Sequence, residues 1–438
     1  MSKPKTRWIV IFLILIALQL VSVFSADSDF SVEAAAGIDR SDTAWMIVAT
    51  AFVLFMTPGL SFFYGGMISY KNVISTMLQS FIALGVISLL WYLVGFSLAF
   101  GESFYGLIGS PITFFSFRNV TLAPNPDFAP TIPFLIFALF QLKFAIITPA
   151  LITGSFAERV KFTSYLLFMC LFSLLIYSPL AHWTWHTEGF LRQWGVLDFA
   201  GGSVVHMSAG FASLAGAYIL GKREHGFHQP ANIPFIILGT GMLWFGWFGF
   251  NAGSALSANG LAVQAFATTN MASASAMITW VMFDALVGRR ISAMGACIGA
   301  VVGLVAITPA AGFVSVGQSV FIGFIAAIAS NLAVYYKQRT SLDDTLDVFP
   351  CHGVGGITGM ILTGVFAKDV GLIYGETKTF LFHLLALAIV AVYTFFGSLL
   401  IYKLTSLITK LRVTKEEERI GLDISQHAER LQPVPSEN

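Results

Sequence analysis

The sequence predicts an all-α polytopic membrane protein, with eleven transmembrane helices arranged as two inverted five-helix repeats and one further C-terminal helix. Three observations lead to this fold class. Hydrophobic residues make up 56% of the 438 residues, charged residues only 11%, and the mean hydropathy is +0.78. Such a composition excludes a soluble globular protein. Long apolar segments recur along the chain, and two of them contain an acidic residue followed by a histidine.

The first 26 residues have the pattern of a secretory signal peptide. Three basic residues within the first seven positions precede a short apolar stretch from Trp8 to Leu20, and Ser25 and Ala26 then lead into a polar segment. An uncleaved transmembrane helix is the alternative, but the shortness of the apolar stretch favours cleavage. Cleavage would place the mature amino terminus outside the cytoplasm.

Eleven apolar windows follow, each close to the ~20 residues that a helix needs to cross the hydrocarbon core. The predicted spans are 44–66, 73–99, 131–155, 162–185, 200–220, 232–256, 261–287, 291–309, 313–336, 347–367 and 379–405. They define a transmembrane domain at 42–405 and a C-terminal tail at 406–438.

Basic residues predict the orientation of these spans. The loops assigned to the cytoplasm carry Lys71, Arg159, Lys161, Lys222, Arg223, Arg289, Arg290, Lys337 and Arg339, whereas the outer loops carry Arg118, Arg192, Lys368 and Lys378. Nine basic residues in the cytoplasmic loops against four in the outer loops agree with an amino terminus outside the cell and a carboxyl terminus in the cytoplasm. Two halves of five spans each must then have opposite orientations, so the repeats are inverted.

The two segments that combine an acid with a histidine are Asp198–Gly210 and Asp347–Gly356. His206 lies eight residues into the fifth span, roughly 12 Å deep. His352 lies nine residues into the tenth span if that span begins near Asp343, roughly 14 Å deep. A lone membrane histidine often satisfies only a helix contact, but two at matching depth in inverted halves predict a functional pair. Two neutral imidazoles can share one hydrogen bond and pass on a proton.

Asp198 and Asp347 stand where these two helices begin. A carboxylate at this position caps exposed amides and matches the positive end of the helix dipole. We therefore predict a structural role for both.

These motifs resemble the ammonium transporter family, the Amt branch of the Amt/Rh superfamily. Ala157–Arg159 (Ala-Glu-Arg) and Gly246–Ser254 (Gly-Trp-Phe-Gly-Phe-Asn-Ala-Gly-Ser) add to the resemblance, which runs from about Asp42 to about Asp423. It implies a transporter of the prokaryotic plasma membrane that deprotonates ammonium and conducts ammonia past the two histidines, with or without a proton. It also implies a homotrimer embedded in lipid, and an Asp198 that organises the recruitment site without touching the substrate.

The resemblance further implies a recruitment site at the outer mouth. The cation-recruiting Trp and Ser of the family fall on Trp185 and Ser254, although an interfacial tryptophan is the alternative for Trp185. The two stacked phenylalanines below the mouth fall on Phe140 and Phe144, whose spacing puts both rings on one helix face. We expect Phe140 to help recruit ammonium, and deprotonation to take place near these two rings. Lys143 departs from the family pattern. Because it points about 100° away from Phe144, we expect it at a subunit contact and not in the conduction path.

The tail from Leu411 to Arg430 resembles the family's regulatory tail, which packs under the neighbouring subunit and can meet a nitrogen-signalling PII-type regulator. The tyrosine often found after its His-Ala-Glu step is replaced by Leu431. A charge run at a terminus is otherwise usually only solvated.

Three alternatives to an ammonium transporter remain open. A Rh-type gas channel of the same fold fits the aromatic mouth and Ser254 less well. A haem-binding redox protein would need two widely spaced histidines on one helix. An ammonium sensor would need a separate signalling partner. His182 and His186 lie one turn apart, but no third ligand is evident, so we expect interfacial residues, no metal and no cofactor. Neither an enzyme activity nor a nucleic-acid partner is expected.

Overall fold

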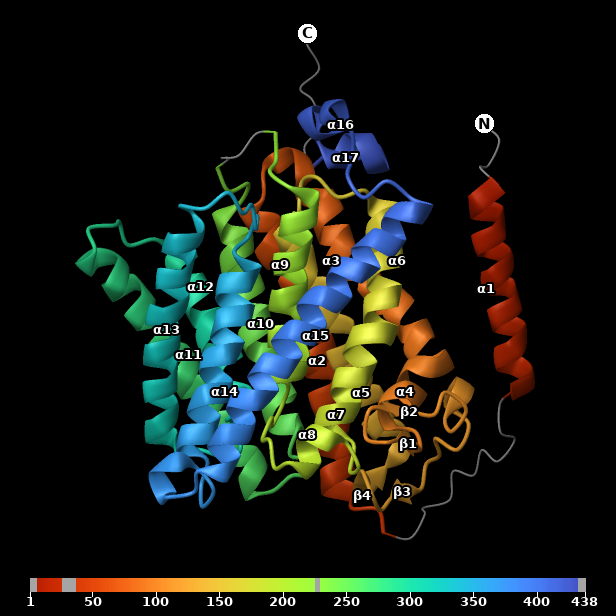
Figure 1. Ribbon diagram of the computed structural model, residues 1–438, viewed down its shortest axis with the longest axis vertical. Coiled ribbons are helices and arrows are strands. Elements are labelled where there is room, and N and C mark those ends of the chain that lie inside the picture. Colours follow the sequence, from red (N-terminus) through yellow and green to blue (C-terminus); the bar gives the residue numbers. More distant parts are fainter. Residues whose placement is uncertain (1–5, 26–36, 225–228, 432–438) are drawn as a thin grey trace.

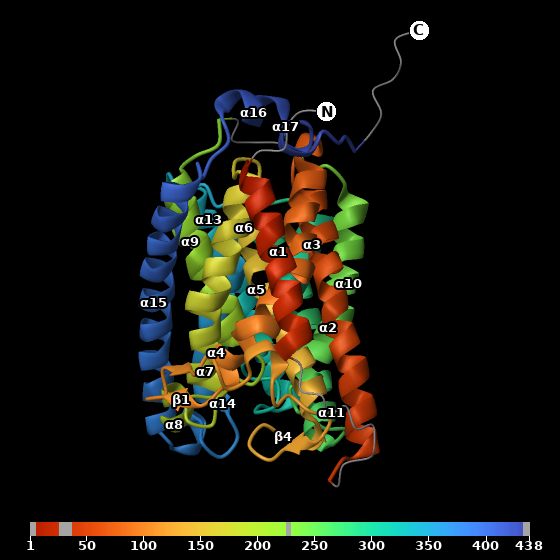
Figure 2. The same ribbon diagram turned by 90° about the vertical axis from the view of Figure 1, so that its right-hand side faces the viewer.

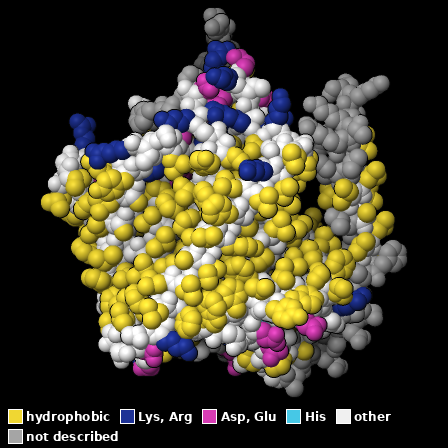
Figure 3. Space-filling model, in the orientation of Figure 1, with side chains coloured by type: hydrophobic (Ala, Val, Ile, Leu, Met, Phe, Trp, Pro, Cys, Tyr) yellow, Lys and Arg dark blue, Asp and Glu magenta, His cyan; other side chains and the backbone are white. Residues whose placement is uncertain are grey.

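The computed structural model describes residues 6–25, 37–224 and 229–431. Helices run side by side through the length of the molecule, and the described part of the chain has only short strands, all at one end (Figures 1 and 2). The predicted all-α membrane fold is confirmed. Figure 3 shows apolar side chains across the middle of one face, while Lys and Arg side chains gather toward the end that carries the C-terminal helices.

Helical segments account for all eleven predicted spans within the described residues. The first half comprises α2 (Arg40–Met67), α3 (Val73–Leu90) continued by η2 (Trp91–Gly95) and α4 (Phe96–Phe100), α5 (Phe134–Phe156), α6 (Phe162–Phe172) continued by η4 (Ser173–Tyr177) and α7 (Ser178–Trp185), and η5 (Gly202–Met207) continued by α9 (Ser208–Leu220). The second half comprises α10 (Ile233–Gly253), α11 (Gly260–Leu286), α12 (Ala293–Ile307), α13 (Val316–Lys337), and η6 (Phe349–Val354) continued by α14 (Gly355–Phe366). The eleventh span is α15 (Lys378–Ile408).

Shorter elements connect these spans. They are η1 (Tyr70–Asn72), β1 (Ser103–Phe104) paired with β2 (Ile108–Gly109), η3 (Phe115–Phe117), β3 (Pro124–Asn125) paired with β4 (Ala129–Pro133), α8 (Phe190–Gln193), η7 (Leu372–Tyr374), α16 (Lys415–Ile420) and α17 (Leu422–His427). Both strand pairs are antiparallel.

Polar residues in the connections fix where several spans begin. Asp39, Asn232, Asn259 and Ser292 each accept backbone N–H bonds at the start of α2, α10, α11 and α12. Ser315 does the same for α13 as part of a capping box. A side-chain acceptor at this position replaces the partner that the first helical amides lack.

Two spans differ from the simple apolar helix that the sequence windows suggest. Nine helices of the described chain are long and apolar enough to cross a membrane, and α11 and α12 are not among them. Helix α12 has only 15 residues. It packs closely on α11 because Gly299 and Gly303 have no Cβ, which would lie 2.6 Å from Trp280 and 2.7 Å from Ala276. Small residues at such contacts let helices approach without lipid between them.

The two histidine-bearing spans begin in the same unusual way. Both η5 and η6 are six-residue π-helical turns followed by a regular helix. A Cβ on Gly210 would overlap the backbone of Gly353, so the two spans cross in direct backbone contact. Wide turns of this kind occur frequently at functional sites.

Helix α1 (Thr6–Ser25) runs beside the bundle and stands apart from it in Figure 1. Its apolar side chains, such as Phe12 and Val23, are exposed. Ala26, the end of the predicted signal peptide, lies outside the described residues, and cleavage stays a prediction.

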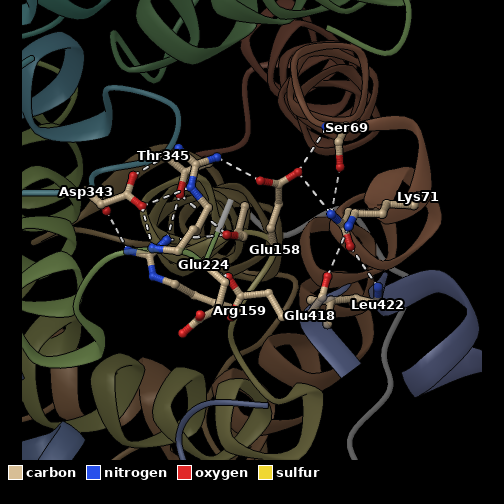
Figure 4. Close-up of polar contacts among 12 residues, drawn as sticks. Ser69, Lys71, Glu158, Arg159, Glu224, Asp343, Thr345, Glu418 and Leu422 are labelled. Atoms are coloured by element: carbon tan, nitrogen blue, oxygen red, sulfur yellow. Dashed lines mark hydrogen bonds and ion pairs between the residues drawn. The ribbon is translucent and has the colours of Figure 1, made fainter. Parts of the chain in front are cut away.

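A network of charged groups closes the end of the bundle where the tail lies (Figure 4). Glu158, from the Ala-Glu-Arg motif, accepts bonds from Ser69 N at 3.1 Å, Asn72 Nδ2 at 2.9 Å and Arg223 at 2.7 Å. Arg223 also pairs with Asp343 at 2.9 Å. Burial alone would raise the pKa of Asp343, but its hydrogen bonds and ion pair with Arg223 hold it below the usual value.

The tail is attached to this network within its own chain. Lys71 Nζ donates to the carbonyls of Glu418 and Arg419 at 3.2 and 2.8 Å. The Asp423 carboxylate accepts from the amides of Ile74 and Ser75 and so caps α3. The predicted packing of the tail under a neighbouring subunit stays a prediction.

Candidate functional site

His206 and His352 meet in the interior of the bundle, as the sequence predicts. Their Nδ1 atoms are 3.3 Å apart, and their ring centroids are 5.4 Å apart. Both side chains are buried. The two spans bring them together because α9 and η6 cross where Gly210 and Gly353 permit close contact.

Thr308, at the end of α12, determines which nitrogens of the pair carry protons. Its hydroxyl donates its only proton to the Leu304 carbonyl at 2.8 Å and accepts the Trp247 indole N–H at 2.9 Å. His206 Nε2 lies 3.3 Å from the same oxygen, which can only accept. This pattern puts a proton on Nε2 of His206, so its Nδ1 accepts the Nδ1–H of His352.

A small cavity borders His352 on the side of Tyr64, Leu346 and Cys351. Its volume is about 10 Å³. This is about the smallest volume that can hold one water molecule.

At the end opposite the tail, a larger cavity of about 380 Å³ forms a mouth. Trp185 and Ser254 line it, at the positions that the resemblance implies. Phe144, which was expected below the mouth, also lines it, together with Gln141. Phe140 does not line it. This ring is fully buried and touches Phe144 edge to face, with centroids 4.9 Å apart, instead of stacking on it.

The ring that does stack on Phe144 is Phe250, which sequence reasoning did not single out. Their centroids are 4.1 Å apart, and Phe250 is also 6.1 Å from the His206 ring. Trp185 meets Phe144 at 5.8 Å. A continuous series of aromatic contacts therefore leads from the mouth to the histidines. The signal for Phe250 was its place within the Gly246–Ser254 motif.

Asp198 has the structural role that its position predicts. Its carboxylate accepts the amides of Gly201, Gly202 and Ser203 at 2.6 to 2.8 Å, and the Ser203 hydroxyl at 2.5 Å. Its carbonyl accepts the Trp185 indole N–H at 3.0 Å. One residue thus fixes both the start of η5 and the orientation of the indole.

The corresponding prediction for Asp347 is wrong. Asp344 is the residue whose carboxylate accepts the amide of Phe349, at 2.7 Å, while Asp347 pairs with Lys337 at 2.7 Å. The tenth span begins at Phe349, several residues later than Asp343, and Asp344 caps it from five positions before Phe349. Burial raises the pKa of Asp344 to about 6.

His182 and His186 lie at the end of α7, and their place at the membrane interface stays a prediction. Both are buried, and their rings stack at 4.2 Å. His182 bonds to Ser103 Oγ and Ala99 O, and His186 accepts the amide of Glu188. Among the described residues, no group of three or more His, Cys, Asp or Glu side chains could hold a metal ion.

Lys143 is half-buried and is not among the residues that line the mouth. This position agrees with the predicted offset from the conduction path. Its place at a subunit contact stays a prediction.

Comparison with known proteins supplies independent findings. Residues 44–431 match the family model described as Ammonium Transporter Family. A putative ammonium transporter of Methanothermobacter thermautotrophicus is 46% identical over 402 residues, covering 90% of this chain and 98% of the relative. An ammonium transporter of Aquifex aeolicus is 44% identical over 418 residues, covering 94% of this chain and 97% of the relative. The crystal structure of Saccharomyces cerevisiae Mep2 matches with a TM-score of 0.82 at 35% identity, covering 87% of this chain and 89% of Mep2. A structure titled Sensor Amt Protein matches with a TM-score of 0.82 at 31% identity, covering 89% of this chain and 98% of that protein.

Proposed function

The chain belongs to the ammonium transporter family, and from this premise we propose that it deprotonates ammonium and conducts ammonia past His206 and His352. The observation that carries the proposal is the buried, hydrogen-bonded histidine pair at the end of an aromatic path from an open mouth. The family is one of transporters, so the chain is not an enzyme.

Recruitment takes place at the mouth. The indole N–H of Trp185 is engaged by Asp198, which leaves the face of the ring for a cation. A cation over an indole face gains about 0.5 to 2 kcal/mol. The Ser254 hydroxyl donates to the Phe250 carbonyl at 2.8 Å, so its lone pairs can accept an N–H of ammonium. These two groups recognise a cation that is also a hydrogen-bond donor.

Deprotonation follows from the aromatic barrier below the mouth. Phe144 and Phe250 are stacked and buried, and neither ring can replace the hydration of a charged ion. Burying a charge without compensation costs far more than burying a neutral molecule. Ammonia avoids this cost after ammonium gives one proton to solvent water in the open mouth, whereas potassium has no proton to lose and is refused.

The histidine pair then provides hydrogen-bonding groups within an otherwise apolar passage. The Nδ1–H of His352 is shared with His206, and the Nε2–H of His206 is held by Thr308. In this arrangement the remaining ring nitrogen, Nε2 of His352, is free to accept a hydrogen bond from ammonia. The same chain of donors and acceptors can hand on a proton if one accompanies the ammonia.

We further place the mouth outside and the tail in the cytoplasm of a prokaryotic cell, with residues 1–26 as a signal peptide, 42–405 as the transmembrane domain and 406–438 as the tail. The excess of basic residues on the tail side supports this orientation. A homotrimer and a PII-type regulator at the tail are part of the same proposal and rest on the family resemblance.

Flux of ammonium into proteoliposomes tests the proposal. It should exceed the flux into protein-free liposomes and saturate with external ammonium, because recruitment at the mouth precedes conduction. A flux that never saturates would favour a Rh-type gas channel. Folded, reconstituted protein without any flux would contradict transport and favour a sensor of the same fold.

A further inference from the structure

His383, on α15, lies at the centre of an arrangement that the mechanism above does not use. The side chain is fully buried. Its Nε2 is 2.9 Å from the amide nitrogen of Leu197, and its Nδ1 is 2.9 Å from the carbonyl oxygen of Met360. Because an amide only donates and a carbonyl only accepts, the ring is neutral with its proton on Nδ1.

One partner precedes a histidine-bearing span and the other lies within the second such span. Leu197 directly precedes Asp198, the cap of η5, and Met360 lies on α14, eight residues after His352. Helix α15 stands outside the two five-helix halves, so His383 joins the start of one such span to the body of the other. A ring fixed at both nitrogens has little freedom to shift.

The segment that His383 holds also forms part of the mouth. Leu197, Asp198 and Trp185 all line the mouth cavity, whereas His383 does not. The segment has no regular secondary structure. Two of its amides donate to residues outside the segment. Leu197 N donates to His383, and Phe199 N donates to the Pro309 carbonyl at 3.1 Å. Between these two anchors lies the Asp198 carbonyl that holds the Trp185 indole.

We propose that His383 is a positioning residue for the ammonium-recruiting site, because it sets the orientation of the Trp185 indole through Leu197 and Asp198 without touching the substrate. The proposal rests on the proposed function of the mouth. Its consequence is specific: losing the acceptor nitrogen of His383 should weaken recruitment but leave the path past the histidine pair intact.

The test measures ammonium flux into proteoliposomes over a range of concentrations for three substitutions. His383→Leu removes the acceptor and the donor. His383→Asn keeps a donor near the position of Nδ1 but does not reach Leu197. His383→Gln places an amide oxygen near the position of Nε2 and can accept from Leu197. Thr394→Val, a polar-to-apolar change at another fully buried position of α15, is the matched control.

His383→Leu and His383→Asn should raise the half-saturating ammonium concentration by roughly 3-fold or more, within the range that loss of a cation–π contact allows. The maximal flux should change by less than about 2-fold, because the path past the histidine pair is intact. His383→Gln and Thr394→Val should both behave like the unmodified protein. The Asn variant keeps the test decisive if the Leu variant does not fold.

A double-mutant cycle with Trp185→Leu separates positioning from a general packing effect. If His383 acts through the indole, His383→Asn should raise the half-saturating concentration no further in the Trp185→Leu background. Unchanged half-saturation in both His383→Leu and His383→Asn would overturn the proposal, and so would full additivity with Trp185→Leu. Unmodified protein that carries no ammonium would instead contradict the proposed function itself.

Discussion

The Nδ1 atoms of His206 and His352 lie 3.3 Å apart although 146 positions separate the two residues in the chain. Each comes from a π-helical turn at the start of a span, and the two spans cross at a pair of glycines. This contact buries two ionisable rings side by side in the interior of the bundle. Ionisable residues inside a membrane domain generally mark a substrate or proton pathway.

Replacing Trp185 with Leu should weaken recruitment without closing the path. The indole face contributes about 0.5 to 2 kcal/mol to cation binding, so the half-saturating ammonium concentration should rise by roughly 2- to 30-fold. Maximal flux should stay close to that of the unmodified protein. If the concentration dependence of flux is unaltered, Trp185 only anchors the helix at the membrane interface.

Phe250→Ala should let potassium leak through the domain, because the ring stacked on Phe144 separates the mouth from His206. The substitution should also lower stability by about 3 to 5 kcal/mol, as for other buried phenylalanines. Potassium flux into proteoliposomes measures the leak. Phe248→Ala is the control, since Phe248 stacks on Phe266 away from the path. Equal potassium flux in both variants would argue against a barrier at Phe250.

Lys143→Thr should leave transport by each subunit unchanged and loosen the oligomer in detergent, because Lys143 does not line the mouth. A buried ammonium group costs at least ~2.5 to 3.5 kcal/mol, so it needs water or a partner. Size-exclusion chromatography and flux assays on the same preparation check both points. Lys403→Thr, an exposed position on α15, is the control. Higher flux with an unaltered oligomer would place Lys143 in the conduction path.

Asp344→Asn should raise the thermal stability of the protein in detergent at pH 7.5 but not at pH 4. Burial raises the pKa of Asp344 to about 6, against an ordinary value of 3.8, so the folded state binds the proton more tightly than the unfolded state. Ionised Asp344 therefore destabilises the fold by on the order of 1 to 3 kcal/mol above about pH 6. This destabilisation shrinks as the pH falls and is absent below about pH 4.

The neighbouring Asp343 supplies a control of opposite sign. Its pKa is held below the usual value by Arg223 despite burial, so it stabilises the fold above about pH 4 and loses this effect as the pH falls. Asp343→Asn should lower the melting temperature at pH 7.5. If Asp344→Asn and Asp343→Asn shift the melting temperature in the same direction at pH 7.5, the charges assigned to these two residues are contradicted.

The sequence predicted the parts of this architecture that depend on local pattern. Apolar windows of sufficient length located the spans, and the depth argument brought His206 and His352 together, because both follow from residue spacing along a helix. Asp198 was predicted as a cap for the same reason. Its counterpart Asp344 was missed because it caps Phe349 from five positions away, upstream of Asp347, the acid nearest the start of the span.

Residues that act through distant partners could not be found in this way. Phe250 is one of 42 phenylalanines, and its role depends on stacking with Phe144 from another span. Thr308 and His383 belong to no local motif, and their partners lie 102 and 186 positions away. Such contacts are set by how the spans cross, which periodicity does not specify.

The most direct test of the account compares ammonium and potassium flux, from equal gradients, in the unmodified protein and in His206→Ala and His352→Ala. The unmodified protein should carry ammonium and exclude potassium. Each substitution should reduce ammonium flux and weaken this selectivity while the protein still folds, because small residues already line both spans. Unchanged ammonium flux and unchanged selectivity in both variants would contradict a path that depends on the histidine pair.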